Sequence, residues 1–140
     1  VEHREAGPAM EMCARSVILS AGLVSLMADD NYNCALAHAV CYGLQHFEHV
    51  EREYLHGDLV AYGALVQLAV DGQLDKAREL RAFLVSLGTP VTLAQMRVPL
   101  EKTALHDALI EATTGPDMAH IPYPVTQDMV FDAMRRVETL

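Results

Sequence analysis

Apolar residues recur every three or four positions along most of this chain, and this helical period is the feature that most constrains its fold. The period is clearest where Leu74, Ala77, Leu80, Leu84 and Leu87 fall on one side of a helix and charged residues take much of the other side. No run alternates apolar and polar residues for long enough to indicate a strand. The sequence therefore predicts an all-α class, a helical bundle-like domain.

Proline, glycine and polar residues divide this pattern into six expected helices. Pro8 suits a first helical turn, Asn33 or a neighbour can cap the second helix, and Thr92 can cap a short turn through Gln95. A polar stretch, residues 48–53, separates the second helix from the third. The first four expected helices span residues 8–28, 34–47, 56–70 and 74–87. Apolar positions within 105–112 mark the fifth helix, and apolar positions within 130–137 mark the last. The first is ended by the polar run 29–31, the fourth by Gly88-Thr89-Pro90 and the fifth by Gly115-Pro116, after which Pro122 and Pro124 hold an extended link.

The apolar stretch from Cys13 to Ala28 is short for a bilayer span and contains Arg15, so we expect a buried core helix and no membrane partner. No signal peptide is visible, which favours a cytoplasmic protein. The chain begins at Val1 with a charged segment and not at a methionine. A fragment of a longer protein is therefore one interpretation.

Length and composition limit the partners. The chain has 140 residues, of which 51% are hydrophobic, and this fits one domain, residues 1–140, with a sizeable core. The net charge of −9 argues against nucleic acid and against anionic membrane surfaces. The three cysteines, Cys13, Cys34 and Cys41, form no disulfide pattern and suit a reducing cytosol.

Two histidines, His38 and His56, lie in otherwise apolar helical segments, 18 residues apart. That separation allows one helix, a reversal and the start of the next, so both rings can face one point. Two converging neutral imidazoles would form part of a transition-metal site. By itself, however, His38 fits a core histidine satisfied by one or two hydrogen bonds better than a ligand.

His56 is expected at the start of a helix, where unpaired backbone N–H groups disfavour imidazolium and favour the neutral ring that a metal needs. Gly57 leaves room beside it for a substrate or cofactor. Asp58 can stabilise the helix start or support a metal ligand by a hydrogen bond, and both roles stay open. His46 and His49 fall in or beside the polar link, where solvated histidines are ordinary.

Other catalytic patterns are missing from the sequence. It contains no P-loop, no Gly-rich dinucleotide turn and no Ser nucleophile elbow. A helical metal-dependent hydrolase would need further His or Asp ligands, and the only adjacent pair, His106-Asp107, lies on a helix that we expect to be exposed.

Residues 35–44 and 56–68, which carry the two histidines, closely resemble the glycerol dehydrogenase branch of the iron-containing alcohol dehydrogenase family. Residues 88–96 and the segment beginning at Thr126 also look like that family. The resemblance covers most of the chain, from about residue 8 to the end.

The resemblance implies a two-domain enzyme, of which this chain looks like the helical C-terminal domain only. In that family His38 and His56 match the two histidine ligands of a zinc or iron ion, and the third ligand is an aspartate upstream of anything in this chain. An N-terminal domain, absent here, binds NAD(P) through a Gly-rich turn. The metal acts on the alcohol oxygen as a Lewis acid, and hydride leaves to the nicotinamide.

Three departures from the family pattern concern the neighbourhood of these histidines. The segment Asn31-Tyr32-Asn33 stands where a Ser-Gly-Gly run is common, Cys41 stands where a second histidine often follows the first, and Asp58 replaces a Glu. These departures leave the metal pair intact but concern the substrate pocket, so the resemblance does not assign glycerol as the substrate.

The resemblance thus implies the metal-binding part of an NAD(P)-dependent oxidoreductase that acts on glycerol, another diol or a small hydroxy compound, in an expected homo-oligomer. The alternative is an inactive fragment, a split subunit or a helical interaction module that lacks the cofactor domain. In either case we expect this chain alone to bind metal weakly and to catalyse nothing.

Overall fold

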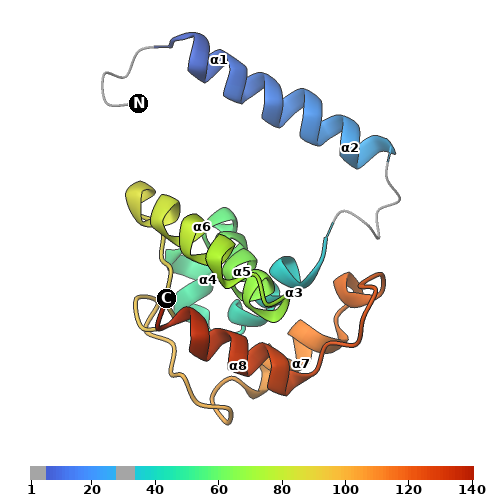
Figure 1. Ribbon diagram of the computed structural model, residues 1–140, viewed down its shortest axis with the longest axis vertical. Helices are drawn as coiled ribbons and strands as arrows, with labels where there is room; N and C mark the ends of the chain where they lie inside the picture. The colour runs from blue at the N-terminus through green and yellow to red at the C-terminus, as the bar shows by residue number, and fades with distance from the viewer. Residues whose placement is uncertain (1–5, 28–33) are drawn as a thin grey trace. The chain divides into compact units, whose positions relative to one another are not determined.

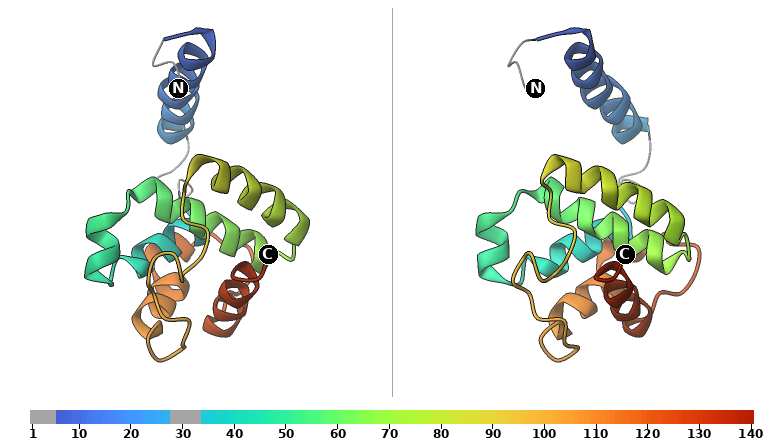
Figure 2. Two further views of the ribbon diagram at one scale, coloured as in Figure 1. Left: turned by 90° about the vertical axis from the view of Figure 1, so that its left-hand side faces the viewer. Right: turned by 60° about the vertical axis from the view of Figure 1, so that its left-hand side comes forward.

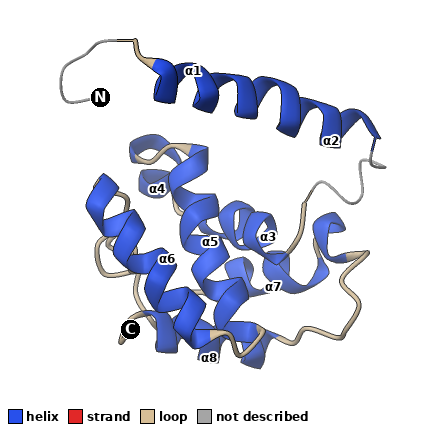
Figure 3. Ribbon diagram, turned by 45° about the horizontal axis from the view of Figure 1, so that its top comes forward, coloured by secondary structure: helices blue, strands red, loops and turns tan. Residues whose placement is uncertain are grey.

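The computed structural model describes residues 6–27 and 34–140, and every regular element within these ranges is a helix (Figures 1 and 3). The all-α prediction is confirmed. By its internal contacts the chain divides into two compact units, Val1–Asn33 and Cys34–Leu140, which we call unit 1 and unit 2. The polar break at 29–31 and the Asn33 cap lie outside the described residues.

Unit 1 contains one continuous helix. It begins with α1 (Pro8–Arg15), continues through the π-helical segment η1 (Ser16–Ala21) and ends with α2 (Gly22–Met27). Pro8 occupies the first turn, as expected, because a missing N–H costs nothing there.

The predicted burial of this helix is wrong, because none of its residues is buried and Leu26 and Met27 are each more than four-fifths exposed. The expected bounds of the helix, 8–28, agree with the observed Pro8–Met27, but the expectation that its apolar part is too short for a bilayer is wrong. These 20 residues, with a window of mean hydropathy 1.4, are long and apolar enough to cross a membrane by length and composition alone. An apolar pattern on all faces indicates that a helix can be buried. The helix becomes buried only where a second surface packs against it.

Unit 2 is built around α5 (His56–Val70), which packs against α3 (Leu36–Leu44), α6 (Leu74–Leu87) and α8 (Gln127–Val137). Helix α7 (His106–Thr114) closes the core by packing on α3 and α8. Figure 2 shows α6 lying alongside α5. Three neighbours explain why α5 is apolar nearly all round.

Two glycines let these helices approach closely. A Cβ atom on Gly63 of α5 would lie 2.1 Å from the Ala37 carbonyl oxygen, and one on Gly43 of α3 would lie 2.6 Å from the Ala108 oxygen. Both distances are far below van der Waals contact with a rigid backbone. The contacts of α3 with α5 and with α7 therefore depend on glycine.

Several expected helix ends are confirmed, although α3 (Leu36–Leu44) is shorter than the expected 34–47. Gly88, with φ of 78°, ends α6 in the left-handed conformation, Gly115 follows α7, and the Thr92 hydroxyl accepts from the Gln95 N–H at 3.1 Å. The expected apolar positions of α7 and α8 are buried. On α6 the prediction is wrong at Leu87, which is 62% exposed, because the helix passes beyond the core there.

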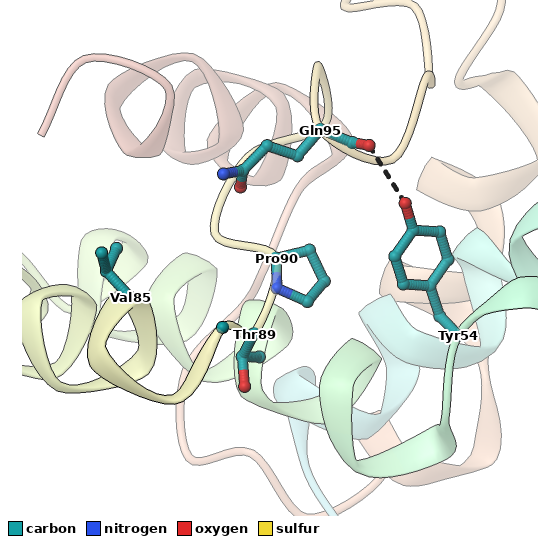
Figure 4. A pocket seen from close by; sticks show the side chains of 6 residues that line it. Tyr54, Val85, Thr89, Pro90 and Gln95 are labelled. Carbon is teal, nitrogen blue, oxygen red and sulfur yellow. Dashed lines mark hydrogen bonds between the residues drawn. The ribbon is translucent and has the colours of Figure 1, made fainter.

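The polar stretch 48–53 proves to be a helix, α4 (Glu48–Glu53), followed by Tyr54. Six mostly charged residues carry no apolar period, which is why the sequence did not reveal it. The Tyr54 hydroxyl donates to the Gln95 carbonyl at 3.0 Å, beside a shallow pocket of about 250 Å³ that Val85, Thr89 and Pro90 also line (Figure 4). This contact ties α4 to the segment after α6.

Tyr62 offers a test of the core. Its side chain is fully buried, burial raises the pKa of its phenol well above the usual value, and its hydroxyl has no hydrogen-bond partner among the described residues. Because an unsatisfied buried hydroxyl costs free energy, we expect Tyr62→Phe to raise the free energy of unfolding by about 1 kcal/mol in urea titrations. Tyr54→Phe removes the hydrogen bond from the Tyr54 hydroxyl to the Gln95 carbonyl and should lower the free energy of unfolding by a similar amount. A loss of stability in Tyr62→Phe would contradict the expectation.

Candidate metal-binding site

The structure brings the two predicted histidines together. His38 is the third residue of α3 and His56 is the first residue of α5, and their ring centroids lie 5.7 Å apart with an interplanar angle of 42°. Zinc–nitrogen bonds of about 2.0–2.1 Å place two imidazoles on one tetrahedral ion with centroids about 5 Å apart. The two rings therefore fit a shared ion after a small adjustment.

A third ring, that of Tyr42, completes the group that we call the His–Tyr cluster (His38, Tyr42 and His56). Its centroid lies 6.5 Å from that of His38 and 5.9 Å from that of His56. His38 is half-buried, His56 is exposed and Tyr42 is 39% exposed. In unit 2 taken by itself, solvent and small molecules therefore have access to the cluster.

The position of His38 is set by the residue before it. The Ala37 carbonyl contacts α5 at Gly63, and the Ala37 N–H donates to the Gln67 side-chain oxygen at 3.1 Å. Gln67 thus satisfies one of the free N–H groups at the start of α3. Both contacts join α3 to α5, the helix that begins with His56, so they fix the spacing between the two imidazoles.

Of the two roles left open for Asp58, the structure shows the first. Its carboxylate oxygen accepts from the Leu55 N–H at 3.2 Å, which stabilises the first turn of α5. It therefore supports the helix on which His56 stands.

Cys41 contacts His56 directly. Its Sγ lies 3.5 Å from His56 Nδ1 and 3.9 Å from the His56 carbonyl oxygen, and the side chain is fully buried. Burial raises the pKa of the Cys41 thiol to about 11, so the sulfur keeps its proton at neutral pH. Sequence reasoning noted this residue only as a departure from the family pattern and did not anticipate the contact.

The other histidines of this region take different places. His46 is exposed, as expected, whereas His49 Nε2 lies 3.0 Å from the Met96 carbonyl oxygen and its ring packs edge-on against Phe47. His49 thus joins α4 to the segment after α6 and is not a freely solvated side chain.

No group of three or more His, Cys, Asp or Glu side chains that could hold a metal occurs within residues 6–27 and 34–140. His106 and Asp107 are both exposed, at the start of α7. The hydrolase interpretation therefore finds no ligand set in the described part of the chain. The expected third ligand beyond this chain stays a prediction.

Comparison with known proteins gives a consistent group of relatives, although no family model matches the chain. Hydroxycarboxylate dehydrogenase A of Escherichia coli is 34% identical over 126 residues, which cover 89% of this chain and 34% of that protein. Glycerol dehydrogenase of Thermotoga maritima is 30% identical over an alignment of 143 positions, which covers 99% of this chain and 37% of that protein. Glycolaldehyde reductase of Halobacterium salinarum is 30% identical over 85% of this chain and 33% of its own length.

The chain spans about a third of the length of these relatives. Other relatives of similar identity are glycerol dehydrogenases, from Pseudomonas putida and Citrobacter freundii among others. These similarities show that the chain is a homologue of glycerol dehydrogenases and related oxidoreductases, in agreement with its resemblance to the iron-containing alcohol dehydrogenase family.

Proposed function

We propose that this chain is the metal-binding helical domain of a polyol or hydroxy-compound dehydrogenase, with His38 and His56 as ligands of a zinc or ferrous ion. The observation that carries the proposal is the 5.7 Å spacing of the two imidazoles, which come from different helices. A metal there would supply Lewis-acid polarisation of the substrate alcohol oxygen.

The remaining parts of the proposed enzyme lie outside these 140 residues. Because the chain spans about a third of its relatives, the proposal assigns NAD(P) binding and a third, aspartate ligand to an N-terminal domain. The names of the relatives support a small polyol, hydroxycarboxylate or hydroxyaldehyde as the substrate. Solvent access to the His–Tyr cluster is compatible with a substrate of this size.

We propose that other parts of the dehydrogenase cover the exposed helix Pro8–Met27. The alignment with the Thermotoga maritima glycerol dehydrogenase extends over 99% of the chain and so includes this helix. We also propose that the complete enzyme is a cytoplasmic homo-oligomer that has no membrane or nucleic-acid partner. The second candidate, an inactive helical interaction module, is favoured by the apolar side chains that this helix leaves exposed.

Zinc binding by the chain tests the metal pair. Calorimetric titration should show one weak site, because two imidazoles without a third protein ligand leave two positions of a tetrahedral ion to water. His38→Ala and His56→Ala should each weaken binding at least about tenfold, since each removes half of the protein ligands.

The matched control is His46→Ala, which removes an exposed histidine two residues beyond the end of α3. It should leave zinc affinity unchanged. Equal affinity in the unmodified chain, His38→Ala and His56→Ala would exclude these two residues as the site and favour the interaction module.

A further inference from the structure

We propose that Cys41 is a positioning residue that holds His56 in the tautomer whose Nε2 is free to bind a metal. This inference rests on the proposed function, because it assigns a role to a residue beside the proposed ligand pair.

The first step is geometric. Cys41 lies on α3, three residues after His38, and its sulfur reaches the first residue of α5. The 3.5 Å separation from His56 Nδ1 is a hydrogen-bonding distance for sulfur, and the Cys41 side chain is fully buried. The contact therefore restrains one nitrogen, Nδ1, of an otherwise exposed ring.

The second step concerns the proton. A thiol has one hydrogen and sulfur lone pairs that accept weakly. The Cys41 S–H has a pure acceptor in the His56 carbonyl oxygen, 3.9 Å away. With the hydrogen directed there, the sulfur lone pairs face the ring and accept from an Nδ1–H, which leaves Nε2 unprotonated.

The third step connects the tautomer to metal binding. A ligating histidine usually donates its other ring N–H to a nearby acceptor, and this contact fixes both the tautomer and the ring orientation. In this structure the sulfur of Cys41 occupies that place for His56. The role of Cys41 is thus to prepare His56 and not to bind the ion itself, in agreement with the lack of a three-residue ligand group among the described residues.

Nitrogen-15 NMR of the metal-free chain reads the tautomer directly. We expect His56 to show a protonated Nδ1 and an unprotonated Nε2. The Nε2–H form in the unmodified chain would overturn the inference, whatever the zinc titration gives.

Two variants separate hydrogen bonding from packing. Cys41→Val keeps an apolar side chain in the buried position and removes the acceptor, whereas Cys41→Ser keeps an acceptor. Cys41→Val should shift His56 toward the Nε2–H tautomer and weaken zinc binding about tenfold, the lower end of the effect of removing such partners. Cys41→Ser should retain the Nδ1–H tautomer and recover part of the affinity.

Cys13→Val is the control, since Cys13 is an exposed cysteine of α1 in unit 1. It should change neither the tautomer nor the zinc affinity. An unchanged tautomer in Cys41→Val would refute the role of Cys41 even if zinc binds at His38 and His56. If the tautomer of His56 responds as expected but neither His38→Ala nor His56→Ala changes the zinc affinity, the proposed metal site is wrong. The hydrogen bond between Cys41 and His56 is then still supported.

Discussion

Replacing Gly63 with alanine is expected to lower the free energy of unfolding by about 3 kcal/mol, the upper end of the usual cost of overpacking. The added Cβ atom would lie 2.1 Å from the Ala37 carbonyl oxygen, and this oxygen belongs to the backbone of α3, so no side-chain rotation relieves the clash. The helices α3 and α5 must separate. Urea titration followed by circular dichroism measures the loss.

The same change should also disturb the histidine pair. His38 follows Ala37 directly, so a displacement of α3 from α5 carries its imidazole away from His56 and weakens zinc binding. Gly57→Ala is the matched control, because it makes the same substitution on the same helix and its Cβ atom would meet nothing within 4 Å. Gly57→Ala should leave stability equal or raise it by up to about 1 kcal/mol. Equal stabilities of the two variants would show that α3 and α5 lie further apart than described.

The second large effect is expected in catalysis. In the complete dehydrogenase to which we propose this chain belongs, His56→Ala should lower kcat/KM for a diol or hydroxy acid by about a thousandfold. A Lewis-acid metal contributes several kcal/mol of stabilisation as charge develops on the substrate oxygen, and each 1.36 kcal/mol is a factor of about ten in rate. Steady-state nicotinamide absorbance measures this loss.

His106→Ala provides the control for catalysis, since His106 is exposed at the start of α7 and belongs to no ligand group in the described residues. Its turnover should match that of the unmodified enzyme. The 140-residue chain alone, mixed with zinc, NAD(P) and glycerol, should give none. Turnover that survives His56→Ala would disprove the proposed role of the metal pair, and turnover by the chain alone would show that no further domain is needed.

Much of the helical architecture of unit 2 was predictable because its signals are local. The apolar period identified the buried faces of α7 and α8, and Gly88 and Gly115 marked the ends of α6 and α7. Local signals failed where a helix has no apolar period, as in α4, and where burial depends on a second surface, as for Pro8–Met27.

The sequence predicted which two histidines form the candidate site, but not how the residues around them are arranged. The types and spacing of His38 and His56 suggested that their rings can meet, and their centroids lie 5.7 Å apart. The contact of Cys41 with His56 carried no sequence signal beyond a departure from a family pattern. A cysteine in an apolar helix reads as a small core residue until its neighbour is known.

By itself, the sequence determined that the chain is helical, where α5 and α6 begin and end, and which two histidines are candidates for a metal. These properties follow from periodicity and from capping residues, which act over a few positions. Only the tertiary structure decided that α3 and α5 cross at Gly63 and Ala37, that Gln67 caps α3, and that Cys41 meets His56. Such contacts join residues 15 to 30 positions apart, and their geometry depends on how closely two backbones can approach.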